Sequence, residues 1–169
     1  MQTPEQFLQI VKSIVELDDL SDYQKISQKL ALEVKVMSEQ DTYISQQEGR
    51  GKLINIEVVK IENQIWDQQP KDFSIGIFQP EGKLFQKIWF RGKLRPEKMC
   101  ITRDAIFKRF GYPIRESIAT DLGPVTSFFD FRKKNWITLE AHFHRAVNSN
   151  NERCVIKIGF SQNIHGTQE

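Results

Sequence analysis

Hydrophobic residues near the N-terminus recur three and four residues apart, which predicts an amphipathic helix. Thr3 is placed to cap the first turn of this helix, and Pro4 suits its first position. The hydrophobic stripe consists of Phe7, Ile10, Val11, Ile14 and Val15. A second helix is expected after Ser21, its N-cap, and runs through YQKISQKLAL. Its hydrophobic stripe consists of Tyr23, Ile26, Leu30 and, at its end, Val34. Residues 1–34 are therefore predicted to form a helical N-terminal segment.

The next part of the chain reads as strands. Residues 35–52 have a mixed pattern, and SEQDTYISQQEGRGK is polar enough for a loop or an edge hairpin. The connections WDQQPKD and QPEGK that follow contain the Pro, Asp and Gly residues of tight turns. They separate predicted strands at 53–62, 73–79 and 84–92. These strands predict a first antiparallel meander over 53–92.

A helix and three further strands fill the second half. Thr102 is the expected N-cap of the helix, and Gly111 is placed to end it, with Pro113 beyond. RKKN and VNSNNE are read as turns between strands. The strands are expected near 124–132, 136–146 and 153–161. Residues 100–161 are therefore predicted to form a helix plus a second meander.

The order of these elements predicts the fold class. A chain of 169 residues has an ordinary size for one domain. We expect a single domain over 1–169 of the α+β class, with an antiparallel sheet of about five to seven strands. The N-terminal helices and the central helix are expected to pack on one face of the sheet. The other face would then meet solvent or a partner.

Alternation along the strands assigns side chains to these two faces. Two sets look buried: Ile137, Leu139, Ala141 and Phe143, and Cys154, Ile156, Ile158 and Phe160. The opposite sides mix Trp, His and charged residues, and Trp and Arg dominate the energetics of protein interfaces. We therefore predict a partner-binding surface that consists of Lys87, Trp89, Arg91, Trp136, Glu140, His142 and His144. The alternative is that a loop or the N-terminal helices cover Trp89 and Trp136.

Charge and composition narrow the class of partner. There are 24 Lys and Arg residues against 22 Asp and Glu residues, so the net charge is only +2. That balance disfavours a protein built to neutralise phosphates. Lys87, Trp89 and Arg91 nevertheless resemble a stacking platform for single-stranded nucleic acid, which stays an alternative. The glycines do not assemble into a nucleotide-binding loop.

Glu140, His142 and His144 also raise the question of a metal site. Alternate residues of a strand lie on one face about 7 Å apart, so two imidazoles with a carboxylate can share a metal. The rest of the sequence contains no second ligand cluster, and His165 is the remaining histidine. We therefore interpret the three residues as a polar interface strand and expect no metal or cofactor.

The two cysteines, Cys100 and Cys154, are too few for a structural zinc site. We expect two reduced thiols on packed elements, and the sequence leaves one disulfide open. A catalytic thiol is an alternative, since Cys100 lies near basic Lys98 and Arg103. The sequence shows neither an oxyanion hole nor an orienting acid for such an enzyme.

The N-terminal segment has no basic stretch that leads into an apolar run, and no window approaches the roughly 18 apolar residues of a membrane span. We therefore expect a soluble cytoplasmic protein without a membrane partner.

The unit CITRDAIFKRFGYP, followed by SFFDFRKKNWITLEAHF and CVIKIGF, resembles a pattern of small bacterial proteins of the β-lactamase-inhibitor-protein-like type. There a capped helix ending in Phe-Gly precedes an antiparallel meander, and the resemblance covers residues 99–160. Several such proteins are immunity proteins that neutralise toxins delivered between competing bacteria, for example by type VI secretion. The resemblance implies a non-enzymatic protein that binds a cognate toxin or effector and occludes its active site. A homodimer is left open. The alternatives are a metal- or thiol-dependent enzyme and a protein that binds single-stranded nucleic acid.

Overall fold

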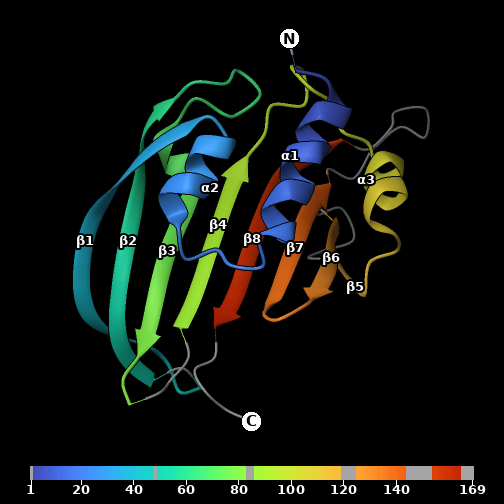
Figure 1. Cartoon of the computed structure of the whole chain (residues 1–169). Coiled ribbons are helices and arrows are strands. Elements are labelled where there is room, and N and C mark those ends of the chain that lie inside the picture. Colours follow the sequence, from blue (N-terminus) through green and yellow to red (C-terminus); the bar gives the residue numbers. More distant parts are fainter. Residues whose placement is uncertain (1, 48, 83–85, 119–124, 144–153, 165–169) are drawn as a thin grey trace.

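Eight antiparallel strands form one sheet, and helices cover one of its faces (Figure 1). The structure is a computed structural model that describes residues 2–47, 49–82, 86–118, 125–143 and 154–164. Within these residues it contains three α-helices and one short 3-10 helix, Pro70–Asp72. The predicted α+β class with an antiparallel sheet is confirmed. The predicted five to seven strands are wrong, because the sheet has eight.

The N-terminal helices form largely as predicted. In α1 (Pro4–Glu16) the Gln6 N–H donates to Thr3 Oγ1 at 3.2 Å, and the Thr3 N–H donates to Gln6 Oε1 at 2.8 Å. This reciprocal cap satisfies two donors that the first turn leaves free. In α2 (Tyr23–Lys29) the cap is Asp22 rather than Ser21, and the helix ends before the predicted Val34. It ends early because Ala31 has a left-handed φ of 60° and turns the chain into the first strand.

The segment predicted as a loop or an edge hairpin is a long hairpin at the edge of the sheet. Strands β1 (Leu32–Ser45) and β2 (Gly49–Ile61) pair along almost their whole length. Most β1 side chains beyond Val34 are exposed, so no hydrophobic alternation marks the strand. Three register shifts interrupt the ladder, at Glu33/Val34, Val36/Ser38 and Tyr43/Ser45. Such bulges twist an exposed edge and disfavour pairing with another chain.

The two meanders are joined through the last strand. Strand β3 (Phe73–Pro80) pairs with β4 (Gln86–Lys93), while β5 (Arg115–Ile118), β6 (Val125–Arg132) and β7 (Trp136–Phe143) pair in sequence order. Strand β8 (Val155–Ile164) lies between β4 and β7, so the order is β1-β2-β3-β4-β8-β7-β6-β5. This insertion brings the strands of the predicted site, β4 and β7, to either side of β8 (Figure 1).

The helices bury the aliphatic and aromatic residues of one sheet face. Helix α3 (Arg103–Phe110) is capped by Thr102 and followed by Gly111, as predicted. Its Phe110 ring packs against the rings of Phe129 and Phe131 on β6. Among the described residues, no helix combines the length and the hydrophobicity needed to cross a lipid bilayer.

The predicted alternation fails at the start of β8. Ile158 and Phe160 are buried as expected, but Val155 is fully buried in place of Cys154 and Ile156, which are half-buried. The ladder between β7 and β8 shifts register at this point, so Phe143 faces Val155. A bulge of this kind moves the following side chain to the other face.

Candidate interaction surface

The sheet face opposite the helices, here called the open face, carries most of the predicted binding residues. Phe90 on β4, Phe160 on β8 and Leu139 on β7 are aligned across the sheet and buried in the core. Because side chains alternate, their sequence neighbours point to the open face. Trp89 and Arg91 therefore lie there from β4, and Thr138, Glu140 and His142 lie there from β7.

Trp89 lies flat on the sheet over a glycine. A Cβ added at Gly76, the residue opposite Trp89 on β3, would collide with the indole ring. The indole Nε1–H donates a hydrogen bond to Ser74 Oγ at 3.1 Å. A strand glycine often marks such a close approach. Trp89 is therefore fixed in position on the open face and is not covered by the N-terminal helices.

Arg91 and Glu140 form an ion pair over a second glycine, Gly159 on β8. The Arg91 Nε–H donates to Glu140 Oε1, and a Cβ at Gly159 would collide with both side chains. Glu140 is only 8% exposed. Burial alone would raise the pKa of Glu140, but His142 and the positive charge of Arg91 outweigh it and hold that pKa below its ordinary value. The carboxylate is therefore ionised at neutral pH and paired within the face.

His142 extends this network to β6. Its Nδ1 lies 3.0 Å from the Thr126 hydroxyl oxygen, and its Nε2 lies 3.7 Å from Glu140 Oε1. The second distance is too long for a hydrogen bond, so this contact is electrostatic. Nε2 is buried and has no hydrogen-bond partner among the described residues. A neutral His142 that keeps its proton on Nε2, toward Glu140, accepts from Thr126 at Nδ1.

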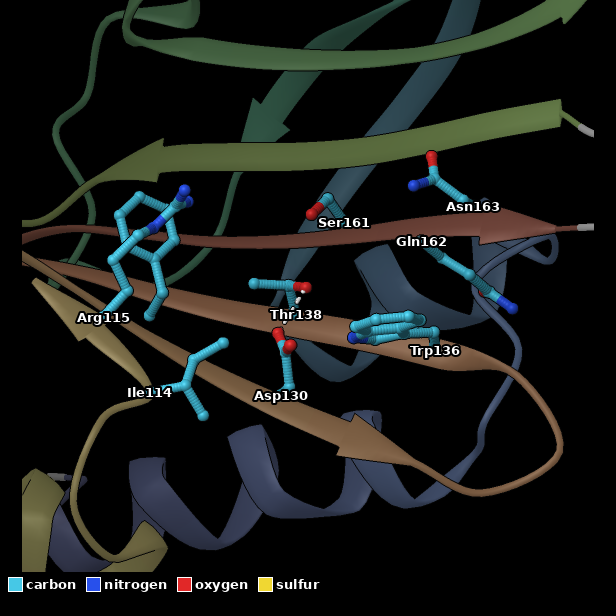
Figure 2. Close-up of a pocket in the computed structure, with 9 residues that line it drawn as sticks. Ile114, Arg115, Asp130, Trp136, Thr138, Ser161, Gln162 and Asn163 are labelled. Atoms are coloured by element: carbon cyan, nitrogen blue, oxygen red, sulfur yellow. Dashed lines mark hydrogen bonds between the residues drawn. The ribbon is translucent and has the colours of Figure 1, made fainter.

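Beside this network the open face contains a shallow pocket of about 480 Å³ (Figure 2). Trp136, which is 44% exposed, forms part of its lining, and the Arg132 guanidinium lies 3.6 Å from the centroid of the Trp136 ring system. Asp130 accepts a hydrogen bond from the Thr138 hydroxyl at 2.8 Å. Ile114, Arg115, Phe128, Ser161, Gln162 and Asn163 complete the lining. The pocket therefore combines an aromatic ring with donors and an acceptor held in place by their neighbours.

The structure brings together Trp89, Arg91, Glu140 and His142, and it places Trp136 at the adjoining pocket. Lys87 is also on β4, opposite Asn163, and burial lowers its pKa. His144, the remaining predicted residue, lies outside the described residues.

Sequence reasoning did not find the residues that hold these side chains. Thr126, Asp130, Gly76 and Gly159 were not selected. The two glycines had a usable signal, because each interrupts a strand pattern, FSIGIF or VIKIGF, where a glycine often marks a close approach. Thr126 and Asp130 had none, since hydroxyl and carboxylate side chains on an open face are ordinary.

The two cysteines form a disulfide, so the prediction of reduced thiols is wrong. Cys100 and Cys154 have Cα atoms 4.9 Å apart, within the range that a disulfide spans. The flanking backbone already holds them together, since the Val155 N–H donates to the Ile101 carbonyl at 2.8 Å. Because a disulfide sulfur is not a thiolate, this arrangement offers no nucleophile for a thiol enzyme.

The metal alternative finds little support in the part of the chain that the structure describes. Within it, no group of three His, Cys, Asp or Glu residues lies close enough together to bind a metal ion. Glu140 and His142 are neighbours, but Arg91 already occupies the carboxylate. That the protein uses no metal or cofactor stays a prediction.

A comparison of this chain with protein families, curated proteins and solved structures found no match. The resemblance of residues 99–160 to immunity proteins therefore stays a prediction.

Proposed function

We propose that this chain is a non-enzymatic protein-binding module and that its open face is the binding surface. One observation carries the proposal: the face presents Trp and Arg side chains that contacts within the face hold in place. Trp89 is fixed over Gly76, Arg91 is fixed by Glu140, and the Trp136 ring is stacked with Arg132. Trp and Arg are the residues that most often dominate binding energy at protein interfaces.

The order of these side chains lowers the cost of binding. A mobile side chain that becomes fixed in a complex costs about 0.5–1.5 kcal/mol in lost freedom. Here the sheet backbone and the contacts of Trp89 and Arg91 have already restricted both side chains. The face therefore suits a partner that also has a rigid, flat surface, such as the rim of an enzyme's active site.

The finer proposal is that the partner is a toxin or effector, which this chain inhibits by covering its active site. It rests on the resemblance of residues 99–160 and on the open face, which extends over neighbouring strands of the sheet. Such inhibition needs no catalytic group. The pairing of Glu140 with Arg91 and of Cys100 with Cys154 accords with this, since both pairs satisfy groups that an enzyme would keep available.

The disulfide indicates in which cellular compartment the protein acts. Lasting disulfides form in oxidising compartments and are rare in the cytosol. Cys100–Cys154 therefore favours action outside the cytoplasm over the cytoplasmic location expected from the sequence. In this proposal, the partner is a toxin that acts in the bacterial envelope or the extracellular space.

The test uses the protein encoded by the neighbouring gene as the candidate partner. We expect a stable complex, with Trp136→Ala weakening affinity about thirtyfold, which corresponds to about 2 kcal/mol. Lys12→Ala on α1, on the helix-covered side, is the control and should leave affinity unchanged. Circular dichroism must show that both variants stay folded. Equal affinity of wild-type and Trp136→Ala protein would count against the open face as the binding surface.

A further inference from the structure

One end of the open face carries a group of three lysines. Lys93 on β4 and Lys157 on β8 face each other directly across the ladder. Both side chains line a hollow of about 360 Å³, and Lys71, from the short 3-10 helix before β3, also lines it. We call Lys71, Lys93 and Lys157 the lysine cluster. Among the described residues, none of the three forms an ion pair with a carboxylate.

The lining of this hollow contains more basic than acidic side chains: Lys71, Arg91, Lys93 and Lys157 against Asp72. Glu140, the buried acid of the face, is committed to Arg91. A hydrogen bond with Asp67 raises the pKa of Asp72, whereas the positive charges of Lys93 and Lys71 lower it, so Asp72 offsets part of the charge of the cluster. His142 on β7 lies opposite Lys157, on the other side of β8 from Lys93.

The placement of Lys93 opposite Lys157 works against folding. Like charges directly opposite each other on neighbouring strands destabilise a sheet. Elsewhere in the sheet this chain pairs opposite charges across strands, as with Lys35 and Glu57 at 3.4 Å. A ligand of opposite charge would relieve this repulsion when it binds.

We propose that the lysine cluster binds a group of carboxylates on the surface of a partner protein. This inference rests on the proposed function, because it names the chemistry of the partner at one end of the same face. Each ammonium group can donate up to three hydrogen bonds, so the hollow suits side chains of Asp and Glu. The partner is therefore expected to be acidic where it meets β4 and β8.

The observations favour an acidic protein over a nucleic acid. Single-stranded nucleic acid binds by stacking its bases on free aromatic faces. Here the Arg132 guanidinium lies over Trp136, and the Arg115 guanidinium lies 4.2 Å from the centroid of the Phe128 ring. Among the described residues of the open face, Trp89 is therefore left without a second free ring beside it on which successive bases could stack. Glu140 and Asp130 also interrupt the positive surface along which a phosphate chain would run. A nucleic acid is therefore an outcome of the test rather than part of the proposal.

The first experiment titrates the whole protein with a decaglutamate peptide at about 50 mM salt, where exposed charges are weakly screened. We expect saturable binding that Lys93→Gln/Lys157→Gln weakens about tenfold, since an exposed ion pair contributes up to about fivefold. The control, Lys35→Gln/Lys52→Gln, removes two lysines of the β1–β2 hairpin that have carboxylate partners and should leave binding unchanged. Absent binding, equal binding by the lysine-cluster variant, or tighter binding of a thymidine decanucleotide would overturn the inference.

The second measurement separates this inference from the proposed function. Lys157→Gln should raise the midpoint of thermal unfolding, because it relieves the repulsion from Lys93 and keeps the attraction between Lys93 and Asp72. In the complex with the neighbouring gene's product, Trp136→Ala reports on the open face and Lys93→Gln/Lys157→Gln reports on the lysine cluster. If only Trp136→Ala weakens the complex, the proposed function stands and the acidic partner is rejected.

Discussion

Because Arg91 is paired with a largely buried Glu140, its truncation is expected to destabilise the protein more than truncation of an ordinary surface arginine would. An exposed ion pair contributes about 0–1 kcal/mol to stability. The Glu140 side chain, however, is 10% exposed, and the Arg91 side chain is 36% exposed. Truncation of Arg91 leaves a carboxylate that is largely out of water, with His142 Nε2 at 3.7 Å from it. A fully buried unpaired charge costs about 3–5 kcal/mol, and because water reaches Arg91 we expect about 2–3 kcal/mol for Arg91→Ala.

A double-mutant cycle measures this interaction. Urea unfolding at pH 7 of the wild type, Arg91→Ala, Glu140→Gln and the double variant should give a coupling energy of about 1.5–3 kcal/mol. The matched control is Lys35 with Glu57, also a cross-strand pair, whose side chains are 64% and 37% exposed. Its cycle with Lys35→Ala and Glu57→Gln should give about 0.5 kcal/mol or less. Coupling energies of equal size in the two cycles would refute the assignment of Arg91 and Glu140 to an ordered, water-poor network.

Three further predictions concern the same face and the disulfide. Because the pKa of Glu140 is lowered on folding, its contribution to stability is present above the ordinary glutamate pKa and is lost as the pH falls through the lowered value. In Glu140→Gln, the loss of unfolding free energy between pH 7 and pH 3, measured by urea unfolding, should therefore be smaller than in the wild type. Gly76→Val should displace the Trp89 ring and cost about 1–3 kcal/mol, with a shift in tryptophan emission, whereas an unchanged spectrum would contradict the close contact. Cys100→Ser should lower the unfolding free energy by about 2–4 kcal/mol, because the disulfide between Cys100 and Cys154 closes a loop over a separation of 54 residues. A reducing agent should cause the same loss in the wild type and no further loss in the variant.

The elements that the sequence predicted are those with one buried face. The cap of α1 at Thr3 and the end of α3 at Gly111 follow from local chemistry, so both were found. Strand β5 was missed and β1 was left undecided, because β5 is exposed on both sides and β1 is exposed over most of its length. Pairing at an edge satisfies backbone groups without requiring hydrophobic side chains, so it leaves no pattern to read.

For the candidate site, alternation was enough to place Trp89, Arg91 and Glu140 on the open face. It did not predict that Glu140 would be buried beside Arg91, because that depends on β8 lying between β4 and β7. The disulfide depends on the same insertion, since Cys154 directly precedes β8. Pairing between residues so far apart in the chain is set by topology and cannot be read from local pattern.

The central position of β8 also determines when the protein can finish folding during its synthesis. Strands β1–β4 form one half-sheet and β5–β7 another, and the described ladders join the two only through β8. Ribosomes add roughly 5–20 residues per second, so the β1–β4 half-sheet waits several seconds for β8 with its β4 edge unpaired, and the β5–β7 half-sheet waits a shorter time with its β7 edge unpaired. A nascent chain that stops or is cut after β7 would leave two separate half-sheets with open edges, which are prone to aggregate. Such a product is not expected to bind a partner. A chain that includes β8 is therefore expected to resist the cell's quality-control proteases, whereas one that lacks β8 is expected to be degraded or to aggregate.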